Sequence, residues 1–487
     1  MQLGEAASSA RRRWLTLVVL GITQLMVALD ATVINIALPR AQVALHFSAG
    51  DRQWAITAYA LAFGSLLLLG GRLGDLWGRR TALVVGLVGF AAASALAGAA
   101  SSFSMLVGAR AVQGAFGAIL APAALAALST TFTDRAERAT AFSIYGALAG
   151  SGAAIGLILG GALTQWASWR WCLFINVVFA VVALAGVVPL IESKPGTQHA
   201  HLDVTGTILA SAGLFAIVYG LAHAVTATWA SAVTITSLVV GVVLIGAFVG
   251  WQKRSEHPLL PLRIVFARTR GGSVVALFIT MMGFFGVSLF LAYYLQGVLG
   301  YSPLRTGIAF LPMVVALGLS ATLASARLLA LSGPRPLVPT GMLLVTLSMV
   351  LFTRLPTRAD YFASVLPGLI LLGLGLGLIF APAAASATAG VTPSDVGAAS
   401  AIVNSSQQIG GSVGTALLNT IAVSVASRAL SHSSAGSPSA RAAAATVHGY
   451  SIAFWWAAGI FATGALFTAI VLESGPPELA VEGPVAA

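Results

Sequence analysis

One acidic side chain stands apart from the other acidic residues of this sequence. Of the fourteen Asp and Glu residues, thirteen fall in polar breaks, in the tails or at the ends of apolar stretches, whereas Asp30 lies well inside one. A charge at the centre of a membrane-spanning helix costs about 2.5–3.5 kcal/mol, so such a residue is expected to face a cavity or a partner and to have a use. A carboxyl group held there can bind and release a proton.

Arg110 is the basic counterpart of Asp30, because it alone among the Lys and Arg residues falls within an apolar stretch. At 1.5 Å per helical residue, Asp30 lies about 24 Å from the inner start of its stretch, and Arg110 about 10 Å from the outer start of its own. In a hydrocarbon core of about 30 Å these depths nearly coincide. We therefore expect the distance between the two groups to set the protonation of Asp30. A static ion pair and a hydrated Asp30 near the outer surface are the alternatives.

Other polar side chains within apolar stretches are candidates for contact with a small-molecule substrate. We assign eight of them to a substrate cavity: Asn35, Gln113, Tyr293, Tyr294, Gln296, Asn404, Gln407 and Gln408. Amides at helical spacing can instead bond one helix to another. Tyrosines near the end of a span are also typical of the membrane interface, where their amphipathic rings are favoured.

Apolar helices long enough to cross a bilayer must position these residues. The chain of 487 residues is 58% hydrophobic and only 8% charged, whereas a soluble domain has about 25% charged residues. A span needs about 20 apolar residues. We predict an all-α integral membrane protein with fourteen spans, at 14–38, 53–71, 80–100, 104–127, 140–164, 171–191, 204–225, 231–251, 272–298, 305–327, 336–354, 361–382, 397–424 and 450–472.

The spans form two sets of six separated by two additional helices. We expect a cytoplasmic N-terminal segment (1–13), a six-helix bundle (14–191), two additional helices with their linkers (192–271), a second six-helix bundle (272–472) and a cytoplasmic tail (473–487). An internal repeat is visible, because GRLGDLWGRR (Gly71–Arg80) and ARLLALSGPR (Ala326–Arg335) share five of ten positions. The Ser- and Ala-rich segment from Ser431 to Thr446 is expected to be a flexible external loop.

The basic residues indicate an orientation in the membrane. With the N-terminus inside, sixteen of the 25 Lys and Arg residues fall on the inner side and eight, Arg52 among them, on the outer side. This excess favours a multi-pass plasma-membrane protein with both termini in the cytoplasm. Arg11 to Arg13 before an apolar run also resemble the start of a signal peptide. The net charge of +11 is dispersed between spans, so no nucleic-acid partner is expected.

Several kinds of chemistry lack their signatures in this chain. Cys172 is the single cysteine, so no intrachain disulfide and no cysteine-cluster metal site can form. No HExxH, CxxC, P-loop or GxSxG motif occurs in its required context, and the seven histidines are scattered. We expect no enzyme activity, no metal and no cofactor.

Five segments resemble motifs of one family, the major facilitator superfamily, and most closely its fourteen-helix drug:proton antiporter branch of the EmrB/QacA type. The segments are LDATVINIALP (Leu29–Pro39), GRLGDLWGRR (Gly71–Arg80), Leu106–Gly114, WRWCLFINV (Trp169–Val177) and GAASAIVNSSQQIGGSVGTAL (Gly397–Leu417). The resemblance implies a major facilitator fold of two six-helix bundles with two additional central helices. It also implies that Asp30 and Arg110 couple transport to protons.

The resemblance assigns two further motifs. A conformational loop motif after the second helix comprises Gly71, Gly74, Asp75, Gly78, Arg79 and Arg80. Within it, Asp75 is expected to accept hydrogen bonds from a neighbouring helix terminus. An antiporter motif in the fifth helix comprises Gly152, Gly156, Gly160 and Gly161, with Leu157 where the family has proline. Plain helix packing is the alternative for this glycine face.

The function implied is a proton-coupled antiporter that exports small amphipathic organic compounds or drugs by alternating access. Protons and the small-molecule substrate are then the partners within the lipid bilayer, the proton gradient supplies the energy, and the protein is a monomer. The same scaffold suits a dedicated exporter of one natural product, siderophore or lipid precursor. Buried amides such as Asn404 and Gln408 leave a non-transporting membrane sensor or membrane-embedded enzyme as the alternative of another class.

Overall fold

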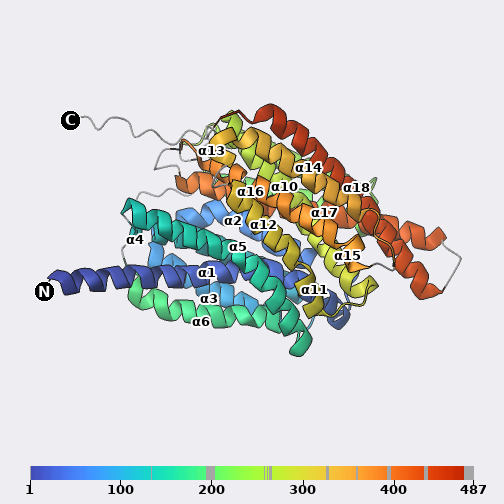
Figure 1. The fold of residues 1–487 in the computed structure, drawn as a ribbon, viewed down its shortest axis with the longest axis horizontal. Coiled ribbons are helices and arrows are strands. Elements are labelled where there is room, and N and C mark those ends of the chain that lie inside the picture. The colour runs from blue at the N-terminus through green and yellow to red at the C-terminus, as the bar shows by residue number, and fades with distance from the viewer. Residues whose placement is uncertain are drawn as a thin grey trace. The chain divides into compact units, whose positions relative to one another are not determined.

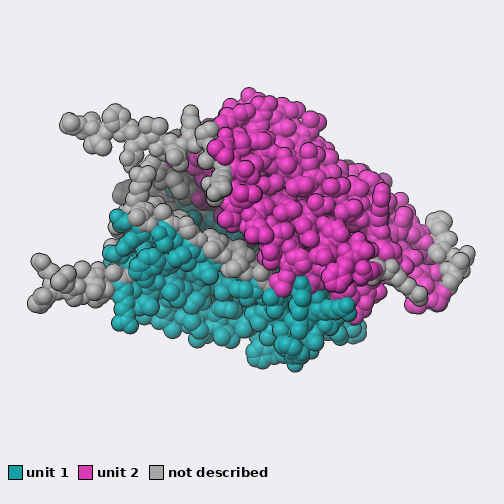
Figure 2. Space-filling view, viewed as in Figure 1, with its two compact units in different colours: residues 1–47, 54–207, 302–308 teal, residues 48–53, 208–301, 309–487 magenta. Residues whose placement is uncertain are grey.

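The structure is a computed structural model, and its regular elements are helices in the part of the chain that it describes (Figure 1). The described residues are 2–132, 134–193, 203–226, 228–256, 258–259, 262, 266–324, 328–357, 360–391, 396–432 and 437–475. The chain divides into two compact units (Figure 2). Unit 1 comprises residues 1–47, 54–207 and 302–308, and unit 2 comprises 48–53, 208–301 and 309–487.

Unit 1 is built from the first six helices and one short helix from later in the chain. They are α1 (Gln2–Leu45), α2 (Trp54–Trp77), α3 (Arg79–Gly98), α4 (Phe103–Thr131), α5 (Arg135–Trp166), α6 (Trp171–Leu190) and α11 (Pro303–Ala309). Within this unit α4 packs against α2 and α3, and α1 packs against α5 and α6. The α3 helix also packs against α6.

Unit 2 repeats this packing scheme with the later helices. Its main elements are α7 (Val204–Thr226), α8 (Ala232–Gln252), α10 (Arg268–Tyr293) with the π-helix η1 (Tyr294–Val298), α12 (Leu311–Leu323), α13 (Leu329–Ser332), α14 (Pro334–Phe352), α15 (Tyr361–Ser364), α16 (Leu366–Thr388), α17 (Val396–His432) and α18 (Pro438–Val471). Here α16 packs against α12 and α14, α10 against α17 and α18, and α14 against α18. In the same order, these pairs correspond in unit 1 to α4 with α2 and α3, α1 with α5 and α6, and α3 with α6.

Two glycines mark the same turn in both units and support the internal repeat. Gly78 precedes α3 with φ +82°, and Gly333 precedes α14 with φ +71°. The two residues occupy the same position in the aligned segments Gly71–Arg80 and Ala326–Arg335. Glycine adopts this backbone region freely, whereas other residues are strained there. The same kind of turn, with a glycine at positive φ, therefore precedes α3 in unit 1 and α14 in unit 2.

Twelve helices in the described residues are long and apolar enough to cross a membrane. Shorter apolar stretches, Trp54–Leu67 and Ile155–Trp166, lie within α2 and α5, helices of 24 and 32 residues. The described residues thus support an all-α polytopic protein with twelve candidate spans, rather than the fourteen expected from the sequence.

Two segments expected to be loops are largely helical. Residues 71–77 of the motif after the second span continue α2, so Gly78 alone separates α2 from α3. The prediction of a loop from Ser431 to Thr446 is also wrong for most of its described residues, because α17 extends to His432 and α18 begins at Pro438, while residues 433–436 lie outside the described part of the structure. Alanine has the highest helix propensity, proline is favoured in the first turn, and the Ser437 hydroxyl accepts from the backbone N–H of Ala440. Capping and propensity thus override the polar composition.

Candidate functional site

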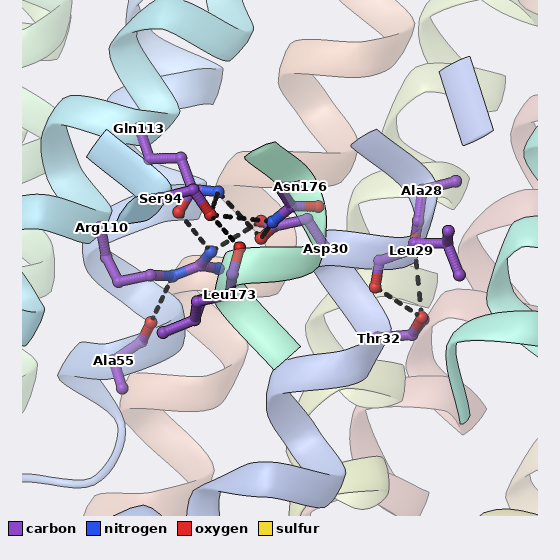
Figure 3. Close-up of polar contacts among 10 residues, drawn as sticks. All are labelled: Ala28, Leu29, Asp30, Thr32, Ala55, Ser94, Arg110, Gln113, Leu173 and Asn176. Atoms are coloured by element: carbon purple, nitrogen blue, oxygen red, sulfur yellow. Dashed lines mark hydrogen bonds and ion pairs between the residues drawn. The ribbon is translucent and has the colours of Figure 1, made fainter. Parts of the chain in front are cut away.

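The carboxyl group of Asp30 lies at the centre of a buried polar network in unit 1 (Figure 3). Asp30 on α1 is 2% exposed and Arg110 on α4 is 1% exposed. Arg110 Nη1 donates to Asp30 Oδ2 at 2.6 Å. The two charged groups that the sequence placed at similar depth are therefore in direct contact.

Two amides hold the other carboxylate oxygen of Asp30. Gln113 Nε2 donates to Asp30 Oδ1 at 2.9 Å, and Asn176 Nδ2 donates to the same atom at 2.7 Å. Gln113 lies one helical turn beyond Arg110 on α4, while Asn176 reaches the site from α6. Every described hydrogen bond to this carboxyl group comes from an N–H donor. Such a donor set fits an ionised carboxylate, which can only accept.

Arg110 is fixed by further contacts from α2 and α4. Its Nε donates to the backbone carbonyl of Ala55 at 3.2 Å, and Nη1 also donates to Gln113 Oε1 at 2.8 Å. The guanidinium carbon lies 4.3 Å from the ring centroid of Tyr59. Cation–π contact and charge-assisted hydrogen bonds both gain strength when water is excluded. The cation is thus tied to α1, α2 and α4 at once.

Ser94 on α3 completes the network. Its hydroxyl accepts from Gln113 Nε2 at 3.2 Å and from Asn176 Nδ2 at 3.0 Å, and it donates to the backbone carbonyl of Leu173 at 2.8 Å. Sequence reasoning missed Ser94, Asn176 and Tyr59. The available signal was the position of Asn176, an amide within the apolar run of the WRWCLFINV segment.

The glycine face of α5 packs directly against α1. A Cβ atom added to Gly152 would lie 2.6 Å from Ala28 Cβ, and one added to Gly160 would lie 3.2 Å from Val33 Cα. A Cβ atom added to Gly156 would likewise clash with Thr32 Oγ1. One added to Gly161 would instead meet Pro303 and Leu304 at the start of α11. Small residues permit this close approach of backbones. The face therefore abuts the helix that carries Asp30.

Gly156→Val is expected to destabilise the protein by about 1–3 kcal/mol, because the added side chain overpacks the contact between α1 and α5. Thr32 cannot yield easily, since its hydroxyl donates to the Leu29 carbonyl at 3.0 Å (Figure 3). Thermal unfolding in detergent measures the loss. The control is Gly108→Val, because an added Cβ at Gly108 meets nothing within 4 Å. Equal unfolding temperatures for the two variants would contradict the expectation.

The motif at the junction of α2 and α3 makes one side-chain hydrogen bond among the described contacts. Its residues are Gly71, Gly74, Asp75, Gly78, Arg79 and Arg80. Arg79 Nη1 donates to Thr130 Oγ1 near the end of α4 at 2.8 Å. The side chain of Asp75 lies outside the described part of the structure, so its expected contact with a helix terminus stays a prediction.

The candidate cavity residues of unit 2 have different surroundings. The Tyr294 hydroxyl donates to the carbonyl of Pro356 at 2.6 Å, which indicates a packing role. Asn404 is exposed and its Nδ2 donates to the Ser400 carbonyl at 2.9 Å. Gln296, Gln407 and Gln408 are half-buried. Their contact with a substrate stays a prediction.

Tyr293 contacts a buried cation that sequence reasoning placed among the outer basic residues. Arg52 is 4% exposed. Its guanidinium carbon lies 4.4 Å from the Tyr293 ring centroid, and Nε donates to Asn419 Oδ1 at 2.8 Å. Nη1 donates to the Tyr450 hydroxyl at 3.2 Å. Unit 2 therefore holds this cation with aromatic rings and neutral acceptors.

Asn35, the remaining cavity candidate, is 4% exposed on α1. Its Oδ1 has no hydrogen-bond partner in the described part of the chain. In the same described residues, no three His, Cys, Asp or Glu side chains are grouped so that they could hold a metal ion.

Comparison with known proteins relates the chain to transporters. The family profile described as Major Facilitator Superfamily matches residues 20–415. The puromycin resistance protein pur8 of Streptomyces alboniger is 46% identical over 465 residues, covering 95% of this chain and 92% of that protein. The multidrug efflux pump LfrA of Mycolicibacterium smegmatis is 33% identical over 413 residues, covering 84% of this chain and 81% of the pump.

The fold agrees with this relationship. A crystal structure of a bacterial homolog of the human lysosomal transporter Spinster superposes with a TM-score of 0.65 at 15% identity, covering 94% of this chain and 97% of that one. At that identity the likeness speaks for the fold alone. The family profile and the resistance and efflux relatives identify the chain as a transporter rather than an enzyme, and it belongs to the Major Facilitator Superfamily of membrane proteins.

Proposed function

We propose that this protein is a proton-coupled antiporter that exports small amphipathic organic compounds of the antibiotic and drug class across the plasma membrane. The observation that carries the proposal is the ion pair of Asp30 and Arg110, joined at 2.6 Å and almost completely buried within apolar helices. Intramembrane ionisable residues of this kind are characteristic of proton relays in transporters. The names of relatives, which record puromycin resistance and multidrug efflux, support an exported substrate of this class.

The coupling follows from charge. In the ionised state Asp30 neutralises Arg110 and accepts three N–H donors. A proton on Asp30 removes its negative charge and leaves Arg110 without a counter-charge, which weakens the ties between α1, α4 and α6. A ligand shifts a conformational equilibrium only if it binds the two states unequally. The proton meets this condition because the observed hydrogen-bond network suits the ionised form of Asp30 better than the protonated form.

The proposed transporter has fourteen spans and uses the proton gradient as its energy source. The helices α2 and α5 span the membrane together with the twelve candidate spans, which gives fourteen spans with both termini in the cytoplasm. The protein acts as a monomer without a cofactor, and the two six-helix bundles alternate access to the substrate. The membrane potential supplies about 2.3 kcal/mol per charge per 100 mV, so one proton can drive an appreciable gradient.

A dedicated exporter of a single natural product is the second candidate. It is favoured by the name of the relative with 46% identity, which records resistance to one compound, puromycin. Comparing puromycin with structurally unrelated lipophilic dyes at equal concentrations distinguishes the two. Transport of puromycin alone supports the dedicated exporter, whereas transport of several dyes supports broad specificity.

The function is tested in proteoliposomes that contain a pH-sensitive dye. Addition of puromycin, or of a substrate dye, is expected to release protons in exchange for the compound, with a rate proportional to the protein present. Liposomes with heat-denatured protein are the control. Substrate movement without any substrate-dependent proton movement would contradict antiport, and the absence of both for every compound would favour a sensor that does not transport.

A further inference from the structure

In the side-chain amide of Asn176, the nitrogen is hydrogen-bonded within the polar network, whereas the oxygen has no hydrogen-bond partner among the described residues. Asn176 is 0% exposed, and its Nδ2 donates to Asp30 Oδ1 at 2.7 Å and to Ser94 Oγ at 3.0 Å (Figure 3). Its Oδ1 is buried without a hydrogen-bond partner among the described residues. Buried acceptors are nearly always paired, so an unpaired one in a network of this kind needs an explanation.

A carboxamide can exchange its two ends. Half a turn about the Cβ–Cγ bond of Asn176 places Oδ1 where Nδ2 now lies, because the two groups are nearly the same size and shape. The observed orientation suits ionised Asp30, whose oxygens only accept. The rotated orientation suits protonated Asp30, because the O–H group then needs an acceptor.

The other neighbours of Asp30 are already engaged. Gln113 Oε1 accepts from Arg110 at 2.8 Å, and the Ser94 hydroxyl donates to the Leu173 carbonyl at 2.8 Å. Among the described side chains that bond to Asp30, Asn176 therefore has the one carbonyl oxygen free to accept a proton-bearing group.

The charged and titratable groups on the helices around Asp30 do not replace Asn176 as the acceptor for a proton on Asp30. Arg110 faces Asp30 from α4, and the Tyr59 ring from α2 packs on Arg110. The α3 helix presents neutral Ser94, and α5 presents its glycine face to α1. On α6 itself, Cys172 bonds to Thr164 and to the Gly160 carbonyl, away from Asp30.

We propose that Asn176 is a positioning residue that senses the protonation state of Asp30, donating to the carboxylate and, after rotation, accepting from the carboxylic acid. This inference rests on the proposed proton coupling. Because the same Nδ2 also bonds Ser94, the rotation breaks a link between α6 and α3 when Asp30 is protonated. Protonation of Asp30 on α1 thereby changes how α3 packs against α6.

The test measures the carbonyl stretching band of protonated Asp30 by infrared difference spectroscopy of the full-length protein, titrated from alkaline to acidic pH. Asp30→Asn identifies the band by removing it. Asn176→Leu, which is close in size but neither donates nor accepts, is expected to raise the titration midpoint by about one pH unit. The midpoint rises because Asn176 stabilises the ionised carboxylate, through a charge-assisted hydrogen bond, more than it stabilises the neutral acid. One pH unit equals about a tenfold change in proton affinity.

A second readout separates positioning from packing. In Asn176→Leu the band of the protonated acid is expected to move to higher frequency, because its O–H loses its acceptor. Cys172→Ala, equally buried four residues earlier on α6, is the matched control and should leave both midpoint and frequency unchanged. Asn176→Ser, whose hydroxyl is too short to reach Asp30, gives the same direction of change if the leucine variant does not fold.

The outcomes distinguish this inference from the function on which it rests. An Asp30 band that titrates with unchanged midpoint and frequency in both Asn176 variants overturns the role of Asn176 and leaves proton coupling intact. If no band assignable to Asp30 titrates in the wild type, and Asp30→Asn still couples transport to protons, the proposed coupling fails and the inference fails with it.

Discussion

Asp30→Asn is expected to abolish uphill transport while leaving the protein folded. With one proton per substrate and a gradient of one pH unit at zero membrane potential, the wild type accumulates substrate about tenfold at steady state, because one unit is worth about 1.4 kcal/mol. The variant is expected to reach a ratio of about one. The asparagine is nearly isosteric and its carbonyl can still accept from Arg110, which offsets part of the cost of leaving that buried cation without its counter-charge, so the main expected loss is one of coupling.

The measurement is the substrate ratio across the liposome membrane, together with downhill exchange of labelled substrate. Downhill exchange is expected to persist in Asp30→Asn, since it needs no proton. Asp51→Asn is the matched control, because Asp51 lies in the segment of the chain that joins α1 to α2, and its carboxylate accepts from the Ser48 hydroxyl at 2.6 Å. A tenfold ratio retained by Asp30→Asn would remove Asp30 from the coupling mechanism.

The charged pair of the site could be predicted from the sequence because charges within apolar spans are rare. Helical rise placed Asp30 and Arg110 at similar depth, and the structure joins them at 2.6 Å. Two neutral members of the network, Ser94 and Asn176, were missed, although the amide of Asn176 within an apolar run was an available signal. Serine and asparagine side chains also bond one transmembrane helix to another, so composition does not distinguish a network member from a packing residue.

The fold was predictable to the extent that hydropathy and turn chemistry determine it. The repeat between the segments at Gly71 and Ala326 predicted two equivalent halves, and Gly78 and Gly333 share one backbone conformation. Helix ends outside the apolar stretches were not predictable from hydropathy. The α18 helix begins at Pro438, in a segment of Ser and Ala, because capping and intrinsic propensity act where hydrophobicity gives no signal.

The cation of the pair determines whether the buried carboxylate is tolerated. Arg110 supplies the shortest hydrogen bond to Asp30 and also holds the Ala55 carbonyl and Gln113 Oε1. Replacing it with leucine leaves three acceptors without their donor and one buried anion without its counter-charge. Breaking one side of a buried ion pair typically costs about 3–5 kcal/mol.

Arg110→Leu is therefore expected to lose about 3–5 kcal/mol of stability and all uphill transport. Arg110→Lys keeps the charge but has no planar fork to serve Asp30, Gln113 and Ala55 together, so partial stability and reduced coupling are expected. Thermal unfolding in detergent and the substrate ratio in liposomes measure the two effects.

The double variant Asp30→Asn with Arg110→Leu separates charge from packing. It removes the unpaired anion, so it is expected to be more stable than Arg110→Leu alone, although it still cannot couple transport to protons. The difference in a double-mutant cycle measures the interaction between the two side chains. Additive losses would mean that Asp30 and Arg110 contribute to stability independently of each other, and then the proton on Asp30 could not act through Arg110.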